Sequence, residues 1–200
     1  MGQKTIITIG CQYGSGGHEV GKLLAQRLNI AFYDKEILME ASKNSDIDET
    51  LLKSYDESPV DVAAYSMNTG AGANYNQPMS EKIYLAEFHT IRQLANEKSC
   101  VFVGRCADYV LKGVDNCINI FIHAPLKERI KRVCKRDRLE QREAEIIIRK
   151  MDKEREKYYN FYTNRKWGDA SNYNMAIDTE RIGPQGAVDL IERFLNIANG

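Results

Sequence analysis

The sequence lacks an excess of charge of either sign. Its 200 residues include 28 lysine and arginine side chains and 28 aspartate and glutamate side chains, so the formal net charge at pH 7 is zero. Without a basic surplus, no overall field draws the chain to the phosphates of a nucleic-acid polymer or to an anionic membrane. We therefore expect neither as a partner, and any recognition of phosphate must be local.

Long hydrophobic runs and paired cysteines are also missing. The apolar stretch near the N-terminus, TIITI, is too short for the core of a signal peptide or for a membrane span. The five cysteines are odd in number and include no C-x-x-C pair, which argues against a disulfide framework and a zinc site. We expect reduced thiols, a cytoplasmic location and no transition-metal centre.

Apolar runs alternate with helical patterns along the chain. Strand-like runs occupy 6–9, 100–103, 118–122 and 173–177, with a weaker one at 31–33, and helical spacing fills 17–28, 80–98 and 125–136. Strands that are apolar throughout and separated by helices indicate a parallel sheet covered on both faces. We predict one α/β domain over 1–200, with a charged, exposed helix at 140–157.

The stretch GCQYGSGGHE, at positions 10 to 19, follows the first strand and opens the first helix. Backbone N–H groups and the positive end of a helix form an anion site at such a turn. Glycine at these positions permits positive φ and close approach of a phosphate. The alternative is a plain strand-to-helix turn. The residues expected to bind nucleotide phosphates are Gly14, Ser15, Gly16, Gly17, His18 and Glu19.

This glycine loop lacks the lysine of the Walker motif G-x-x-x-x-G-K-[ST]. Aligned on the strand and the helix, the lysine position falls on Gly17 and the magnesium-binding hydroxyl position on Glu19. His18 is the nearest possible cation, although imidazole is mostly neutral near pH 7 unless a phosphate favours its charged form. Glu19 offers a hard oxygen ligand to Mg²⁺, or else repels a triphosphate.

Four further stretches complete an ordered set: FYDKEIL at 32–38, FVGRCADYVL at 102–111, DKEREKYY at 152–159 and KWGDASNYNMAIDT at 166–179. With the glycine loop, they resemble the cytidylate kinase-like family, a branch of the P-loop nucleoside monophosphate kinases. The resemblance implies a three-layer α/β fold with a central five-stranded parallel sheet, a mobile substrate-binding insertion at 58–78 and a lid-like helical region at 136–168. It also implies transfer of the γ-phosphoryl group of ATP to CMP or dCMP with Mg²⁺.

The resemblance assigns roles to three charged residues. Arg105 falls where the family's arginine contacts the monophosphate; its alternative is a helix-start arginine paired with a carboxylate. Asp152 and Arg155 fall in the lid, where an aspartate reads the cytosine edge and an arginine binds phosphate; their alternative is a solvated i, i+3 ion pair. Asp108 lies two residues later than the family's aspartate, so its role stays open.

Other charged residues extend this expected site. Asp34 follows the second strand, where monophosphate kinases place an acid near the substrate, although a helix N-cap explains it equally well. Arg132, Arg136 and Arg138 precede the charged helix, where lid arginines of related kinases stabilise the transferring phosphoryl group; each taken singly is as readily a surface arginine. The expected catalytic residues are His18, Arg132, Arg136 and Arg155.

Two alternatives to a nucleotide kinase remain open at this point. The missing lysine is compatible with a catalytically weak protein that senses or sequesters a nucleotide, and a reshaped insertion is compatible with a kinase of a non-nucleotide small metabolite. Aromatic side chains gather after the lid aspartate, and core packing or a homodimer contact explains them better than a platform for a base. These aromatic residues are Tyr158, Tyr159, Phe161, Tyr162 and Trp167.

Overall fold

The computed structural model describes residues 4–34, 37, 39–40 and 79–198 of the chain. Five strands form one sheet in the order β2-β3-β1-β4-β5, and every pairing is parallel. The strands are β1 (Ile6–Cys11), β2 (Ala31–Tyr33), β3 (Cys100–Val103), β4 (Cys117–His123) and β5 (Met175–Asp178). The predicted central sheet is confirmed, whereas the predicted insertion at 58–78 lies outside the described residues.

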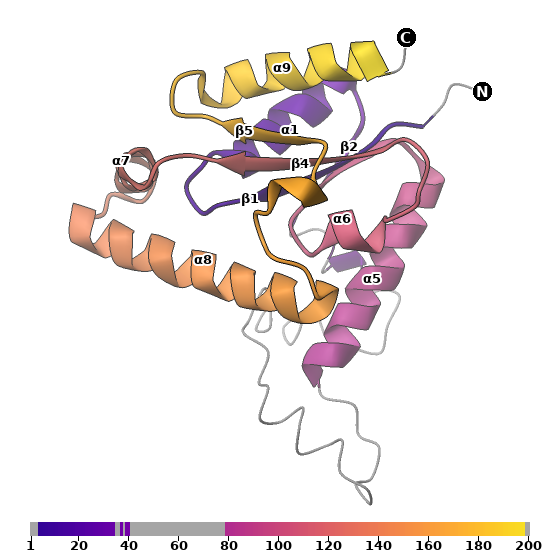
Figure 1. Ribbon diagram of the computed structural model, residues 1–200, viewed down its shortest axis with the longest axis horizontal. Helices are drawn as coiled ribbons and strands as arrows, with labels where there is room; N and C mark the ends of the chain where they lie inside the picture. Colours follow the sequence, from indigo (N-terminus) through magenta and orange to yellow (C-terminus); the bar gives the residue numbers. More distant parts are fainter. Residues whose placement is uncertain (1–3, 35–36, 38, 41–78, 199–200) are drawn as a thin grey trace, which may run out of the picture.

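Helices cover both faces of the sheet, as predicted. Figure 1 shows α1 (Gly17–Leu28) and α9 (Gly183–Ala198) on one face, and α5 (Met79–Glu97), α6 (Ala107–Val110) and α8 (Gln141–Thr163) on the other. α7 (Leu126–Asp137) follows β4, and the 3-10 turn η1 (Ala170–Asn172) precedes β5. Among the described helices, none has the length and apolar composition needed to cross a membrane.

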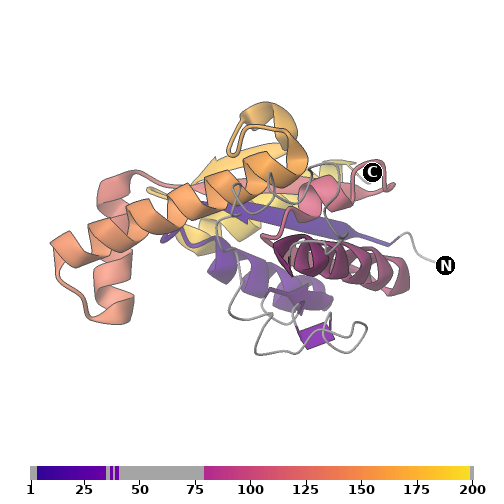
Figure 2. The same cartoon turned by 90° about the horizontal axis from the view of Figure 1, so that it is seen from below.

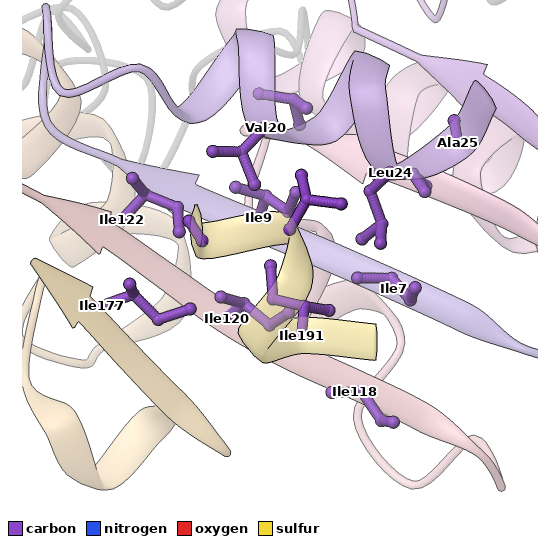
Figure 3. Close-up of a cluster of buried hydrophobic side chains, with 14 of the residues drawn as sticks. Ile7, Ile9, Val20, Leu24, Ala25, Ile118, Ile120, Ile122, Ile177 and Ile191 are labelled. Carbon is purple, nitrogen blue, oxygen red and sulfur yellow. The ribbon is translucent and has the colours of Figure 1, made fainter. Parts of the chain in front are cut away.

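The strands are apolar throughout because both faces of the sheet are buried. Ile7 and Ile9 of β1 point toward α1 and α9, where Leu24 packs on them (Figure 3). Ile191 of α9 belongs to the same buried cluster. The opposite core contains Ile6, Ile37, Ile91, Phe102, Val110 and Leu111. Full burial of one such side chain stabilises the folded state by roughly 1.5–3 kcal/mol. The apolar cores on the two faces of the sheet therefore hold β1 in position.

The sheet order places β1 between β3 and β4, so the connections that leave β1 and β3 run to opposite sides of the sheet. In open parallel sheets, ligands bind at the carboxyl ends of the strands beside such a switch point. Figures 1 and 2 show α7 and the first part of α8 projecting beyond this edge. Val133 of α7 is buried with Ala144 and Ile148 of α8, so the two helices form one unit, here called the lid pair (residues 126–163).

Candidate active site

A cavity of about 620 Å³ opens at the carboxyl edge of the sheet. Its walls come from the glycine loop (residues 10–19), the turn after β3 and the lid pair. The structure brings ten of the sequence-predicted site residues to this cavity: Gly14, Gly16, Gly17, His18, Glu19, Asp34, Arg105, Arg132, Arg136 and Arg155. Two other predicted residues, Ser15 and Asp152, do not line it, and Arg138 is exposed at the end of α7.

The glycine loop turns sharply before α1 begins. Gly14 has φ +77° and Gly16 has φ +92°, which is the left-handed region that glycine adopts without a steric cost. Gly16 is the N-cap of α1 and makes no side-chain cap bond, so the first N–H groups of the helix have no partner within it. These N–H groups and the positive end of α1 favour an anion at this point.

Gly17, at the Walker lysine position, has no room for a side chain. A Cβ there would lie 2.3 Å from Cβ and 2.7 Å from Sγ of Cys11, the last residue of β1. Such distances are far below van der Waals contact, so any larger residue would force α1 away from β1. The missing lysine therefore has a local steric cause.

Ser15 does not face the cavity, which corrects its predicted place among the phosphate ligands. Its side chain is fully buried, with the hydroxyl oxygen 2.8 Å from the carbonyl of Gln12 and 3.0 Å from that of Ile122. The hydroxyl thus ties the loop to β4. Its carbonyl oxygen accepts hydrogen bonds from Arg132 and from Thr179. The bonds of Ser15 therefore stabilise the conformation of the loop.

His18 and Asp34 form a close pair at the mouth of the cavity. His18 Nδ1 lies 2.6 Å from Asp34 Oδ2, which links the first turn of α1 to the end of β2. The imidazole also meets Phe32 edge-on, with ring centroids 5.4 Å apart. When Nδ1 carries the hydrogen toward the carboxylate, Nε2 is the atom left to interact with a ligand.

Arg105 lines the cavity and is also half of a buried ion pair. Its Nη1 lies 2.6 Å from Glu87 Oε1, and both side chains are only 3% exposed. Tyr158 donates its hydroxyl to the other carboxylate oxygen at 2.8 Å. The carboxylate pairing that we gave as the alternative for Arg105 is thus present. It holds the guanidinium rigidly beside the cavity, since a buried charge is stable only when it is paired.

Two of the aromatic residues noted above donate hydrogen bonds to buried carboxylates. Tyr158 and Tyr159 are both buried, and Tyr159 donates its hydroxyl to Asp108 at 2.7 Å. Burial raises the pKa of the Asp108 carboxyl above its usual value. Both tyrosines are thus held in the packed interior and also line the cavity, so a platform for a base there stays a prediction.

The lid pair contributes arginines that bond to the backbone of the loop and of the strand ends. Arg132 donates to the carbonyl oxygens of Ser15 and Thr179, at 2.7 and 2.6 Å, and to the Thr179 hydroxyl at 2.7 Å. Arg155 Nη1 donates to the carbonyl oxygen of Cys11 at 3.0 Å. Arg136 pairs with Asp137, whose carboxylate raises the pKa of the guanidinium.

Asp152 is held away from the cavity by two hydrogen bonds. Its Oδ1 accepts from the backbone N–H of Tyr13 at 2.8 Å, and its Oδ2 lies 2.5 Å from Arg129 Nη1. Arg129 is itself buried. In this arrangement, the carboxylate connects the lid pair to the loop, and its predicted role toward a base stays a prediction.

Residues 6–181 match the sequence model of the cytidylate kinase-like family. The chain belongs to that family. A cytidylate kinase of Thermococcus kodakarensis is 35% identical over 108 residues, a match that covers 52% of this chain and 54% of that protein. The chain thus spans about half the length of the first curated relatives that it matches. A cytidylate kinase of Methanocaldococcus jannaschii is 24% identical over 198 residues, with 96% and 97% of the two chains covered.

Two solved structures resemble this chain in fold. An uncharacterized protein from Eubacterium ventriosum is 32% identical, with a TM-score of 0.74 and 96% of this chain and 99% of that chain covered. Shikimate kinase from Acinetobacter baumannii, in complex with shikimate, has a TM-score of 0.54 at 15% identity, covering 98% and 95% of the two chains. The second likeness concerns the fold alone, and it agrees with the predicted P-loop kinase architecture.

Sequence reasoning missed Tyr13, Arg129 and Thr179. Arg129 shares a face of α7 with Arg132 and Arg136, because the three lie at i, i+3 and i+7. The sequence already contained this spacing, and Arg138 does not follow it. No comparable signal marks Tyr13 or Thr179, whose partners lie more than forty positions away along the chain.

Glu19 is the side chain of the cavity best suited to Mg²⁺. It is exposed in the first turn of α1, and a carboxylate oxygen beside substrate phosphates is the usual protein ligand of this ion. In the part of the chain that the structure describes, no three histidine, cysteine, aspartate or glutamate side chains gather as a metal cage. A single carboxylate beside phosphates fits a magnesium ion that arrives with a nucleotide.

Proposed function

We propose that this protein is a nucleotide-dependent kinase that transfers the γ-phosphoryl group of ATP to a nucleoside monophosphate, with CMP or dCMP as the leading acceptor. One observation carries the proposal: Arg105 after β3, Arg132 of α7 and Arg155 of α8 line one cavity with the open N-terminus of α1. Phosphoryl transfer requires positioned phosphates and positive groups around the developing charge, with little covalent work by side chains.

In this proposal, the glycine loop binds the phosphates of ATP and the lid pair supplies positive charge. The first N–H groups of α1, after Gly16, bind the phosphates of ATP, while Arg132 holds the loop through the Ser15 carbonyl. Arg155 and Arg136 approach from the lid pair and stabilise the charge that develops on the transferring group. Magnesium, when bound, neutralises charge on the phosphates, and Glu19 would hold it.

Arg155 is the strongest candidate to replace the missing lysine. Its guanidinium bonds to the carbonyl oxygen of Cys11, where β1 runs into the glycine loop, although it is carried by α8. Gly17 has no space for a Walker lysine, so the positive charge at this place has to come from another element. A guanidinium also binds phosphate oxygens through two parallel hydrogen bonds, which an ammonium group does not do.

The acceptor belongs on the β3 side of the cavity. Arg105 is fixed there by Glu87, and its guanidinium lines the cavity at the place where an acceptor phosphate would bind. Asp34 lies beside it, because Arg105 Nε donates to the Asp34 carbonyl oxygen at 3.3 Å. For Asp152 to read a cytosine edge, its carboxylate would have to leave Arg129 and the backbone N–H of Tyr13.

The His18–Asp34 pair favours a second candidate, a kinase of a small metabolite that carries a hydroxyl group. The phosphate oxygen of a monophosphate is already ionised, whereas an alcohol needs a base. His18, oriented by Asp34, would take the hydroxyl proton on Nε2. At the same time, the hydroxyl oxygen would bond to the γ-phosphorus, and the bond from that phosphorus to the bridging oxygen of ADP would break.

The test is ADP formation from ATP and Mg²⁺ against CMP, dCMP, UMP, AMP and GMP and against shikimate and gluconate, with product masses checked. The proposal predicts CDP or dCDP, and loss of His18 should leave that turnover within about threefold of wild type, since no base is needed. Turnover on a hydroxyl acceptor alone, reduced about 10²–10⁴-fold in His18→Ala, would instead establish the second candidate. Binding of ATP without turnover on any acceptor would mean a nucleotide-binding protein.

A further inference from the structure

Tyr13, in the middle of the glycine loop, is bonded to the lid pair through every part of the residue. Its backbone N–H donates to Asp152 Oδ1 at 2.8 Å, and its carbonyl oxygen accepts from Arg129 Nη1 at 3.3 Å. Its hydroxyl accepts from Arg136 Nη2 at 2.8 Å. Its ring lies 5.1 Å from the guanidinium carbon of Arg136 and 5.7 Å from that of Arg155. All of these partners lie on α7 or α8.

Through these contacts, one residue of the glycine loop is bonded to both helices of the lid pair. The Ser15 hydroxyl anchors the glycine loop to β4, and Arg132 of α7 donates to the Ser15 carbonyl oxygen, whereas the first part of α8 extends beyond the sheet edge (Figure 2). Tyr13 lies between them and also lines the nucleotide cavity. Because the backbone and the side chain of Tyr13 both face the lid pair, the position of the loop and that of the lid arginines are coupled.

The ring face gives this link a specific chemical property. An aromatic face attracts a guanidinium within about 6 Å through its quadrupole and does not accept hydrogen bonds from it as a carboxylate does. A ring contact takes up no N–H donor of the guanidinium, so it adds to the hydrogen bonds of Arg136 to Asp137 and of Arg155 to the Cys11 carbonyl and does not replace them. A carboxylate at position 13 would instead compete with the nucleotide for the same donors.

We propose that Tyr13 is a positioning residue, which holds Arg136 and Arg155 at the phosphate cavity through its ring and thereby couples the lid pair to nucleotide binding. The proposal rests on the proposed function, because it takes the cavity to be a nucleotide site. It concerns ATP and is independent of the acceptor. The Tyr13 ring should therefore raise the affinity for MgATP and should order the lid pair in the nucleotide-free protein.

The test compares variants that keep or remove the ring. Tyr13→Phe and Tyr13→Trp keep an aromatic face, while Tyr13→Leu removes it at similar apolar bulk. Calorimetric titration with MgATP should show a loss of affinity of about tenfold in Tyr13→Leu and of at most about threefold in the two aromatic variants. Hydrogen exchange of 126–163 in the nucleotide-free protein should rise in Tyr13→Leu alone.

The matched control is Tyr109→Leu. Arg165 lies 5.3 Å from the ring of Tyr109, so this variant removes the same kind of contact, and Tyr109 does not line the nucleotide cavity. It should bind MgATP like wild type. Wild-type affinity and wild-type exchange in Tyr13→Leu would overturn the proposal. A tenfold loss of MgATP affinity in both Tyr13→Phe and Tyr13→Trp would also overturn the proposal. These two variants still test it if Tyr13→Leu does not fold.

Failure of the proposed function has a different signature. If wild-type protein binds no MgATP at all, the nucleotide site itself is wrong. Hydrogen exchange of 126–163 then still tests whether the Tyr13 ring orders the lid pair. Unchanged hydrogen exchange in a folded Tyr13→Leu protein would show that the ring does not order the lid pair. Raised exchange would show that it does, with the cavity then serving a ligand other than MgATP.

Discussion

The Cα of Gly17 faces the side chain of Cys11 so closely that a Cβ on residue 17 would lie 2.3 Å from the Cys11 Cβ and 2.7 Å from its Sγ. In the usual phosphate loop, a lysine would stand at this point. Here the end of β1 and the start of α1 are in contact through a cysteine and a glycine. This pair explains why the loop has no lysine and why cations come from other elements.

Gly17→Ala should therefore destabilise the protein although alanine is the better helix former. Inserting a methyl group into this contact should lower the free energy of unfolding by roughly 1–3 kcal/mol. The additional variant Cys11→Gly should reduce that penalty, because it removes the atoms that the new Cβ meets. Urea unfolding of the four proteins in a double-mutant cycle measures the coupling. Additive effects would show that Cys11 is not the obstacle.

Glu87→Leu should destabilise the protein strongly, because it leaves Arg105 as a buried charge without its carboxylate. Breaking a buried pair from one side costs about 3–5 kcal/mol. Replacing both residues, as Glu87→Leu with Arg105→Met, should recover much of this loss while abolishing binding of a monophosphate. Urea unfolding checks the stability and a CMP titration checks the binding. A double variant no more stable than Glu87→Leu would refute the explanation.

The buried carboxyl of Asp108 predicts a pH dependence of stability. Burial raises its pKa in the folded protein, so the folded state binds the proton more tightly than the unfolded state. Its stabilising contribution is therefore complete below the unfolded pKa of about 3.9 and is lost as the pH rises through the folded value.

Asp108→Asn, which removes this titration, should accordingly gain stability relative to wild type as the pH rises above about 4. Asparagine can still accept from the Tyr159 hydroxyl that bonds to Asp108. Urea unfolding at several pH values measures the difference, and Asp115→Asn, at an exposed position nearby, serves as the control. A difference that does not change with pH would contradict the prediction.

Two cysteines should be inert toward alkylation in the folded protein. Burial raises the pKa of Cys100 and of Cys117 to about 12, so almost no thiolate is present at about pH 8. Mass spectrometry after iodoacetamide treatment should find both residues unmodified in native protein and all five cysteines modified in urea. Rapid native labelling of either residue would contradict the raised pKa of its thiol.

The sheet could be predicted from the sequence because its signal is local. The runs around Ile6, Val101 and Ile120 are apolar at successive positions, and such runs separated by helices leave few arrangements besides a parallel sheet. The short helix α6 has too few residues for a periodic signal. α9 carried a signal in the spacing of Ala187 and Ile191 that sequence reasoning did not use.

The site could be predicted only as a set of candidate residues. The glycine loop and Arg105 follow strand ends, and parallel topology alone brings strand ends together. The partners of the charged groups depend on how the lid pair meets the loop. Asp152 illustrates this, because it bonds to Tyr13 across 139 positions, whereas the sequence offered only a base or its neighbour Arg155 as its partner. Such a choice is set by tertiary packing and leaves no local pattern.

The most direct test of the central claim is the kinetics of ATP-dependent phosphorylation of CMP by Arg155→Gln. If this guanidinium takes the place of the loop's lysine, kcat/KM should fall about 10²–10³-fold in the variant. Arg149→Gln is the control, since Arg149 is exposed on the same helix and pairs with Glu145. It should retain wild-type rates. Equal rates for wild type and Arg155→Gln would contradict the account.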